Sequence, residues 1–168
     1  MEFTYSALEK VIFNEASTEV LPRLLRGLSY KRPFVVASST LAEETGDLSA
    51  LRQALPVELA GFCKAIRSHT PREDALELLD QVRESGADVI ITVGGGSVID
   101  AGKFVQLAIT QGLKHESEIL EYSQQGNGKK GPKYGDFRLF SSTDKIRQLA
   151  IPTTLSGAEF SNSAGVLN

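Results

Sequence analysis

The segment from Asp88 to Ile109, DVIITVGGGSVIDAGKFVQLAI, constrains the fold of this chain more than any other. It begins with a short apolar run rich in β-branched residues, which is typical of a parallel strand buried on both faces. Three glycines follow, and apolar residues then recur at the spacing of one helical face. The segment therefore predicts a buried strand, a glycine turn and a helix in direct succession.

The glycine turn, Gly94-Gly95-Gly96, suits a phosphorylated ligand. Glycine adopts positive φ and lets a ligand approach the backbone without a Cβ in the way. The helix that opens at Ser97 offers free N–H groups and the positive end of its dipole, which together attract phosphate. The alternative is a tight turn that only packs a helix on a strand. Three consecutive glycines followed by Ser and Asp favour the phosphate site.

Two widespread nucleotide-binding patterns do not fit this turn. A dinucleotide fingerprint that starts at the first glycine would need Gly or Ala where Ile99 stands. A Walker P-loop that includes Lys103 would need Gly and Ser or Thr in place of Ser97 and Phe104. The pattern that remains is G-G-G-S-x-x-D-x-x-K, in which the aspartate is Asp100.

Composition narrows the class of protein. A chain of 168 residues supports one domain with a real core. A net charge of −3 gives no electrostatic signal for nucleic acid or for an anionic membrane. The chain has no apolar run of membrane-spanning length, no signal-peptide pattern at its start, and a single cysteine, Cys63. We therefore expect a cytoplasmic protein without nucleic-acid or membrane partners, and the two histidines show no metal-ligand spacing.

The remaining elements predict an α/β fold, a Rossmann-like three-layer parallel sheet with helices on both faces. Phe3–Phe13 predicts edge strands or a hairpin, and Thr70 and Glu73 are spaced as a capping box for the helix before the glycine strand. Further buried strands are predicted at Pro33–Ala37, Val57–Ile66 and Arg147–Ile151, and helices near 17–27, 47–55 and 71–86, with one more short helix over 115–122.

Hydroxyl side chains end two of these strands. Ser38, Ser39 and Thr40 follow the strand at 33–37, and ligands of doubly wound sheets bind at the carboxyl edge. These residues also suit a helix cap, and the two roles are compatible. Pro152–Glu159, PTTLSGAE, follows the last strand and offers donors at the same edge as the glycine turn. Taken alone, this segment is best interpreted as an ordinary turn with a helix cap. Together with the glycine turn, it favours a site in which both loops bind one extended ligand.

These motifs resemble the iron-containing (group III) alcohol dehydrogenases over essentially the whole chain. The resemblance rests on G-G-G-S-x-x-D-x-x-K and on P-T-T followed by a Gly/Ser-Glu element, which Pro152–Glu159 resembles. His69-Thr70-Pro71 places the maleylacetate-reductase-like branch nearest. A relative of the dehydroquinate synthases or glycerol dehydrogenases would share the fold and the cofactor site, but Ser97 and Lys103 fit the alcohol dehydrogenase version better.

The resemblance implies a two-domain, metal-dependent oxidoreductase that moves a hydride between NAD(P)H and a small alcohol or carbonyl compound. Residues 1–168 would be its NAD(P)-binding α/β domain, and the helical domain with the divalent metal, Fe or Zn, would lie beyond this chain. We expect the isolated chain to be inactive, with no catalytic or metal-ligating residue of its own. The alternative is a stand-alone nucleotide-binding or interaction module, favoured by the absence of any nucleophile–base pair or metal cluster in the sequence.

The resemblance also implies which residues hold the cofactor. The pyrophosphate would lie on the glycine turn, Asp100 towards the nicotinamide, and the hydroxyls after the last strand on phosphates, ribose or adenine, whereas Lys103 is expected to face away. These cofactor-binding residues are Gly94, Gly95, Gly96, Ser97, Asp100, Thr153, Thr154, Ser156 and Ser38.

Two further expectations follow from the resemblance. Ser38 stands where many members carry an Asp that binds the adenosine ribose. Without that carboxylate a 2′-phosphate is not repelled, so NADP is admissible beside NAD. The face that meets the helical domain should be apolar and exposed, so we expect a homo-oligomer or strand exchange.

Overall fold

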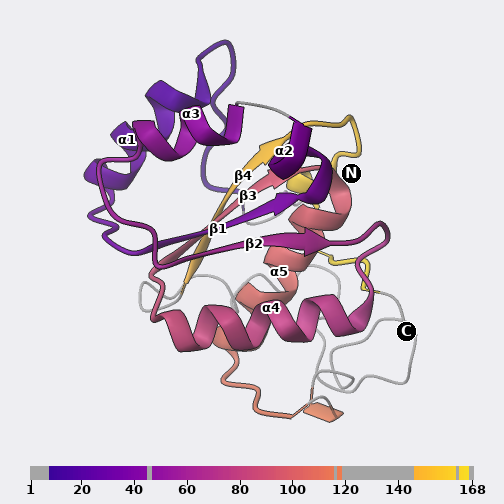
Figure 1. Cartoon of the computed structure of the whole chain (residues 1–168). Coiled ribbons are helices and arrows are strands. Elements are labelled where there is room, and N and C mark those ends of the chain that lie inside the picture. Colours follow the sequence, from indigo (N-terminus) through magenta and orange to yellow (C-terminus); the bar gives the residue numbers. More distant parts are fainter. Residues whose placement is uncertain (1–7, 45–46, 116, 119–145, 162, 167–168) are drawn as a thin grey trace, which may run out of the picture.

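The computed structural model describes residues 8–44, 47–115, 117–118, 146–161 and 163–166, and it is built on one parallel sheet (Figure 1). The sheet has four strands in the order β2-β1-β3-β4. The strands are β1 (Pro33–Ser38), β2 (Gly61–Ile66), β3 (Val89–Gly94) and β4 (Arg147–Pro152). The helices are α1 (Ser17–Gly27), α2 (Ser39–Glu44), α3 (Asp47–Ala54), α4 (Arg72–Ser85) and α5 (Gly96–Thr110), with a 3-10 turn, η2 (Ala158–Phe160).

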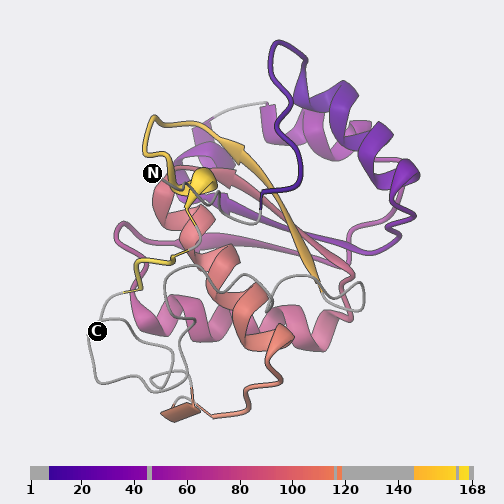
Figure 2. The same cartoon turned by 180° about the vertical axis from the view of Figure 1, so that it is seen from behind.

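Alternate residues of the central strands pack on opposite faces of this sheet. Phe34 and Val36 join a core cluster with α4 and α5, whereas Val35 and Ala37 join a second cluster with α1 and α3. Figure 2 shows the same two helical layers from behind. Each fully buried aliphatic side chain of this kind contributes about 1.5–3 kcal/mol to folding. The expected three-layer α/β fold is confirmed.

The strand order fixes where a ligand binds such a sheet. From β1 the chain moves to β2 on one side, and from β3 it moves to β4 on the other. The direction of winding therefore reverses between the adjacent strands β1 and β3, which pair in parallel. In open α/β sheets the binding crevice lies outside the carboxyl ends of the strands at this reversal. The glycine turn follows one of these two strands and Ser38 ends the other.

The main differences from prediction lie at element ends and at the N-terminus. Strand β2 begins at Gly61 rather than at position 57, and α5 begins one residue before Ser97. Residues 8–13 form no strand, so the expected hairpin is wrong for the described part of that segment. Residues 3–7 of the hairpin and most of a helix predicted over 115–122 lie outside the described residues.

Helix α5 approaches the sheet closely at Gly102. The Gln148 side-chain amide reaches under the helix, where Nε2 donates to Thr92 Oγ1 (2.8 Å) and to the Ile99 carbonyl (3.1 Å). Thr92 is fully buried. A Cβ at Gly102 would lie 2.6 Å from both Gln148 Nε2 and Thr92 Cγ2, closer than atoms pack. Glycine here lets the helix lie against β3 and β4.

We predict that Gly102→Ala lowers the free energy of unfolding. Overpacking of this kind costs up to about 3 kcal/mol. The roughly 1 kcal/mol that alanine gains in helix propensity offsets only part of this cost, because both the Gln148 amide and the buried Thr92 methyl would have to shift. Gly27→Ala is the matched control, because nothing lies within 4 Å of a Cβ at that helix end. Urea unfolding of both variants measures the difference. Equal stability of the two variants would contradict the close approach.

Candidate cofactor-binding site

Three strand ends meet at one edge of the sheet. Ala37 of β1 pairs with Val93 of β3, so Ser38 lies level with Gly94. Gly94 in turn pairs with Pro152 of β4. The structure therefore places the Ser38 segment, the glycine turn and the loop after β4 in a row along the carboxyl edge, as the sequence predicts.

The glycine turn presents the N-terminus of α5. Gly95 is the residue before the helix, and its carbonyl accepts hydrogen bonds from the N–H groups of Val98 (3.1 Å) and Ile99 (3.2 Å). The N–H groups of Gly96 and Ser97 come before these and have no intrahelical acceptor. Together with the helix dipole, these two donors favour an anion at this point.

The loop after β4 packs directly on this turn. The Thr153 N–H donates to the Gly94 carbonyl (3.0 Å). A Cβ at Gly95 would lie 3.2 Å from Cγ2 and Oγ1 of Thr154, and one at Gly96 would lie 3.1 Å from Ser156 Oγ. The two glycines thus allow the close packing of the two loops, because a side chain at either position would press on Thr154 or Ser156. Thr153, Thr154 and Ser156 remain exposed at the edge.

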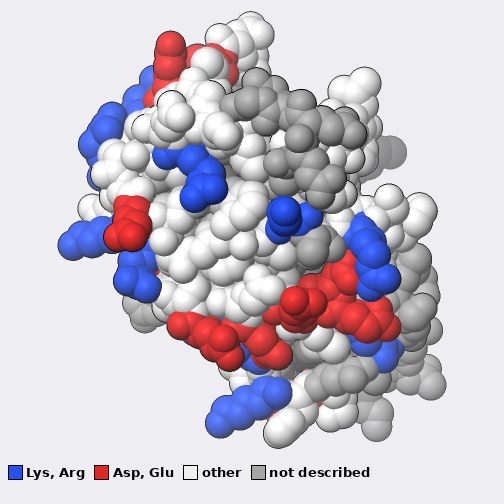
Figure 3. Space-filling model, viewed as in Figure 1, with Lys and Arg blue, Asp and Glu red and all other residues white. Residues whose placement is uncertain are grey.

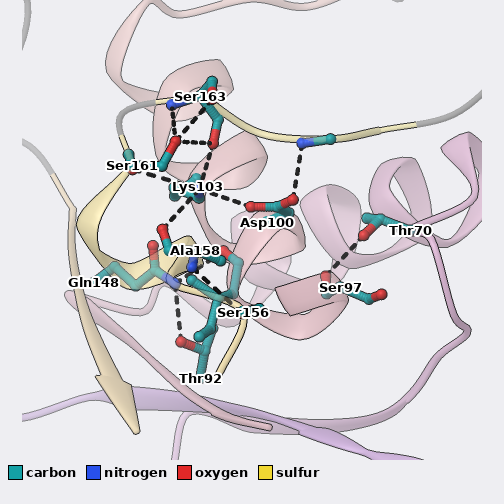
Figure 4. Close-up of polar contacts among 12 residues, drawn as sticks. Thr70, Thr92, Ser97, Asp100, Lys103, Gln148, Ser156, Ala158, Ser161 and Ser163 are labelled. Atoms are coloured by element: carbon teal, nitrogen blue, oxygen red, sulfur yellow. Dashed lines mark hydrogen bonds and ion pairs between the residues drawn. The ribbon is translucent and has the colours of Figure 1, made fainter. Parts of the chain in front are cut away.

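Ser97 is held by a second loop, between β2 and α4. Its Oγ accepts a hydrogen bond from the His69 N–H (2.8 Å), and its carbonyl accepts one from the Thr70 hydroxyl (2.9 Å; Figure 4). The capping box predicted for Thr70 is wrong: α4 starts at Arg72, and Pro71 before it makes no side-chain cap. Thr70 is fully buried and uses its hydroxyl on Ser97 instead. We therefore expect Ser97 to offer a ligand chiefly its backbone N–H.

This β2–α4 loop departs from ordinary backbone geometry. His69 (φ 65°) and Thr70 (φ 49°) both lie in the left-handed region, which side chains other than glycine rarely adopt. A bidentate ion pair closes the loop at its ends, because Asp74 accepts from the Arg67 N–H (2.9 Å), Nε (3.0 Å) and Nη2 (2.6 Å). The hydrogen bonds from Arg67 hold the pKa of Asp74 below its usual range. The pair offsets part of the strain in the loop that supports Ser97.

Ser38 has a structural role as well as its place at the edge. Its Oγ accepts the Leu41 N–H (3.4 Å), which caps α2. The cap weighed from the sequence is therefore present. The side chain is partly exposed beside Gly94 in the register, so a ligand at this edge can still reach it.

Sequence reasoning expects Lys103 to face away from the site, whereas the structure turns its ammonium towards the segment that follows β4. Its ammonium donates to the carbonyls of Ala158 (3.1 Å) and Ser161 (3.4 Å) and to that of Ser163, and it pairs with Asp100 Oδ1 at 2.7 Å (Figure 4). Asp100 Oδ2 accepts the Gly165 N–H at 2.9 Å. The i,i+3 spacing of Asp and Lys on one helix was the available signal for the pair, but nothing in the sequence signals the carbonyls.

Other kinds of site find little support in the described part of the chain. No group of three or more His, Cys, Asp or Glu residues there could hold a metal ion. None of its helices has both the length and the apolar character needed to cross a bilayer. On the face shown in Figure 3, acidic side chains gather over α4 and no broad basic patch is visible. The carboxyl edge is therefore the candidate site.

A parallel α/β sheet with a glycine turn at the reversal of its strand order defines a class of ligand-binding domain, and comparison with known proteins gives its family. The sequence model of the iron-containing alcohol dehydrogenases matches residues 9–168. This chain belongs to the iron-containing alcohol dehydrogenase family.

Individual relatives agree with the family. The chain is 35% identical over 147 residues to dehydrogenase FUM7 of Gibberella moniliformis, a match that covers 85% of this chain and 33% of that protein. It is 29% identical over 106 residues to the maleylacetate reductase of Rhizobium sp. (strain MTP-10005), covering 62% of this chain and 29% of the reductase. The chain thus spans about a third of the length of these relatives.

Solved structures share the fold. The crystal structure of the Rhizobium maleylacetate reductase superposes with a TM-score of 0.59 at 25% identity, covering 93% of this chain and 34% of that one. Sulfoacetaldehyde reductase from Bifidobacterium kashiwanohense, solved in complex with NAD+, gives a TM-score of 0.70 at 17% identity. The match covers 92% of this chain and 36% of the reductase chain. The second likeness concerns the fold alone.

We predict that Asp74→Asn destabilises the protein in a pH-dependent manner. Because Arg67 lowers the pKa of Asp74 in the folded state, the stabilisation is complete above the range where free carboxyl groups titrate. It is lost as the pH falls through the lowered pKa. The stability difference from the unmodified protein should be largest near neutral pH and should shrink towards about pH 3.

Urea unfolding across this pH range measures the effect, with Asp80→Asn as the control. Asp80 is 71% exposed and lies 3.6 Å from Arg83, a surface pair of small energy. If Asp74→Asn were no more destabilising than Asp80→Asn at neutral pH, the ion pair would not brace the loop.

Proposed function

We propose that this chain is the NAD(P)-binding domain of an oxidoreductase that transfers a hydride between NAD(P)H and a small alcohol or carbonyl compound. One observation carries the proposal: Thr154 and Ser156 pack on Gly95 and Gly96 at the N-terminus of α5, beside the reversal of strand order. A dinucleotide is long enough to span both loops, and its pyrophosphate matches the donors at their junction.

Each part of the edge has a role in this proposal. The N–H groups of Gly96 and Ser97 hold the pyrophosphate with the dipole of α5, while Gly94 and Gly95 keep the backbone accessible. The exposed hydroxyls of Thr153, Thr154 and Ser156 bind phosphate, ribose or adenine. When bound, NAD(P) supplies the hydride donor or acceptor, and the residues of this chain bind and orient it.

The family supports hydride transfer for the whole enzyme rather than for this domain alone. The relatives are named as a dehydrogenase and as maleylacetate reductases, and a protein of the same fold was solved with NAD+. The chain spans about a third of such relatives. The described residues do not fit the metal that the family name implies, because they contain no ligand cluster. We therefore propose that substrate and metal chemistry belong to a further, helical domain, and that residues 1–168 alone catalyse no turnover.

A second candidate is nucleotide binding without catalysis. The observation that favours it is the same lack of a metal-ligand cluster among the described residues. The two candidates share the cofactor site and differ in turnover. Reduction of an aldehyde, ketone or maleylacetate by the whole enzyme with metal distinguishes them, since the second candidate predicts none.

We predict that the protein binds NADH or NADPH saturably and that Gly95→Leu abolishes or weakens this binding at least about tenfold. The new side chain would displace Thr154, whose atoms lie 3.2 Å from the Cβ position, and would fill the place of the pyrophosphate. Anisotropy of the nicotinamide fluorescence reports binding. The control is Gly27→Leu, where a Cβ meets nothing within 4 Å. Equal affinities for both variants would contradict the site.

We predict that Ser38→Asp shifts cofactor preference from NADPH towards NADH. A carboxylate beside the adenosine ribose repels a 2′-phosphate and accepts hydrogen bonds from a free 2′-hydroxyl. Asp can still accept the Leu41 N–H and cap α2, so the fold should be retained. The ratio of NADPH to NADH dissociation constants should rise about tenfold or more. An unchanged ratio would remove Ser38 from the ribose site.

A further inference from the structure

We infer that Asp100 and Lys103 form a clamp that positions the loop after β4, which carries Thr154 and Ser156. The two residues would thus affect ligand binding through that loop. The inference rests on the proposed function and assigns these two residues a different task from the rest of the glycine motif. G-G-G-S presents the N-terminus of α5, and D-x-x-K on the same helix holds the chain that follows β4.

The Lys103 ammonium is enclosed by the segment after Ser156. Only 14% of its side chain is exposed. An ammonium group has three protons to donate, and the carbonyls of Ala158, Ser161 and Ser163 accept them, while the Asp100 carboxylate balances the charge as an ion pair. A largely buried ammonium requires such partners. The Lys103 ammonium therefore lies in a site formed by three backbone carbonyls, called the ammonium seat below. All three of its protons have acceptors there, so none is left for a phosphate.

Asp100 closes the clamp from the other side. Its Oδ1 pairs with Lys103, and its Oδ2 accepts the Gly165 N–H. Both carboxylate oxygens thus have partners within the protein. A Cβ at Gly165 would lie 3.1 Å from Asp100 Oδ2, so the glycine allows this close approach. These contacts favour a positioning role for Asp100 over the direct contact near the nicotinamide that the family resemblance implies.

The clamp acts on the cofactor site through Ala158 and Ser156. Ser156 Oγ accepts the Ala158 N–H (3.4 Å), and the Ala158 carbonyl is one of the acceptors of Lys103. Fixing Ala158 therefore fixes Ser156, which lies against Gly96. A loop held in its binding conformation before the ligand arrives loses less entropy on binding, which strengthens affinity. Helix α5 therefore supplies both the anion-binding N-terminus and the support for the opposite loop.

Hydrogen exchange without any cofactor tests the clamp directly. In Lys103→Met, which keeps the apolar stem of the side chain, the hydrogen-bonded amides of Ala158, Ser161, Ser163 and Gly165 should exchange at least about tenfold faster than in the unmodified protein. The amides of β1 and β3 should be unchanged. Gln106→Met, one turn further along α5, is the control and should leave the segment protected. Unchanged exchange in Lys103→Met would overturn the inference.

Chemical rescue separates a clamp from general loss of stability. Lys103→Ala leaves the carbonyls and the Asp100 carboxylate around an open seat, so ammonium ions should restore protection of the segment. Tetramethylammonium at the same ionic strength has no N–H and is too large for the seat, so it should not. Equal effects of the two cations would show that the Lys103 ammonium is not the clamp.

Cofactor affinity then links the clamp to the site. Lys103→Met should weaken NADH or NADPH binding about tenfold, and ammonium should restore most of the loss in Lys103→Ala. Unchanged affinity in a variant with faster exchange would remove the link to binding. The hydrogen-exchange experiment needs no cofactor. Failure of the unmodified protein to bind NAD(P)H would therefore count against the proposed function but not against the clamp.

Discussion

The contact between two strand-end loops is the feature on which the rest of the site depends. Because Gly95 and Gly96 carry no side chains, Thr154 and Ser156 lie against the N-terminus of α5. Parallel pairing of β3 with β4 brings the loops together, since Gly94 and Pro152 end level with one another. A single Cβ on either glycine would press on the opposite loop. The same geometry leaves the exposed hydroxyls of Thr154 and Ser156 beside the N-terminus of α5.

Much of the fold was predictable from the sequence, because buried parallel strands and amphipathic helices have local apolar patterns. The strands near Phe34 and Ile90 and the helices after residues 17, 47 and 71 are confirmed within a few residues at their ends. The edge shared by Ser38, Gly94 and Pro152 was also predictable, because parallel strands bring their carboxyl ends to one side.

Side-chain partners far apart in the sequence were not predictable. The Thr70 hydroxyl had a local interpretation as a helix cap, but burial against Ser97 gave it a better acceptor 27 residues away. The acceptors of Lys103 are backbone carbonyls, and every residue type carries a carbonyl, so no pattern of letters marks them. The bidentate pair of Arg67 with Asp74 likewise depends on a loop whose φ angles no local rule favours.

The glycine motif is covered by the family match and is also the part of the chain whose contacts form the candidate site. The family model covers the stretch that holds G-G-G-S-x-x-D-x-x-K, and the contacts divide this motif between the glycine turn and two residues, Asp100 and Lys103, that hold the segment after β4. In this account the domain contributes a preformed cofactor edge. We propose that the reacting alcohol or carbonyl compound and its activation belong to a further domain.

The central claim is that both loops hold one pyrophosphate, and an NMR titration with ADP-ribose tests it most directly. ADP-ribose keeps the pyrophosphate and lacks the nicotinamide, so it needs no substrate domain to place it. We predict saturable shifts of the amides of Gly96 and Ser97 and, at the same ligand concentration, of Thr154 and Ser156. Shifts confined to one loop, or lying away from the carboxyl edge, would contradict the account.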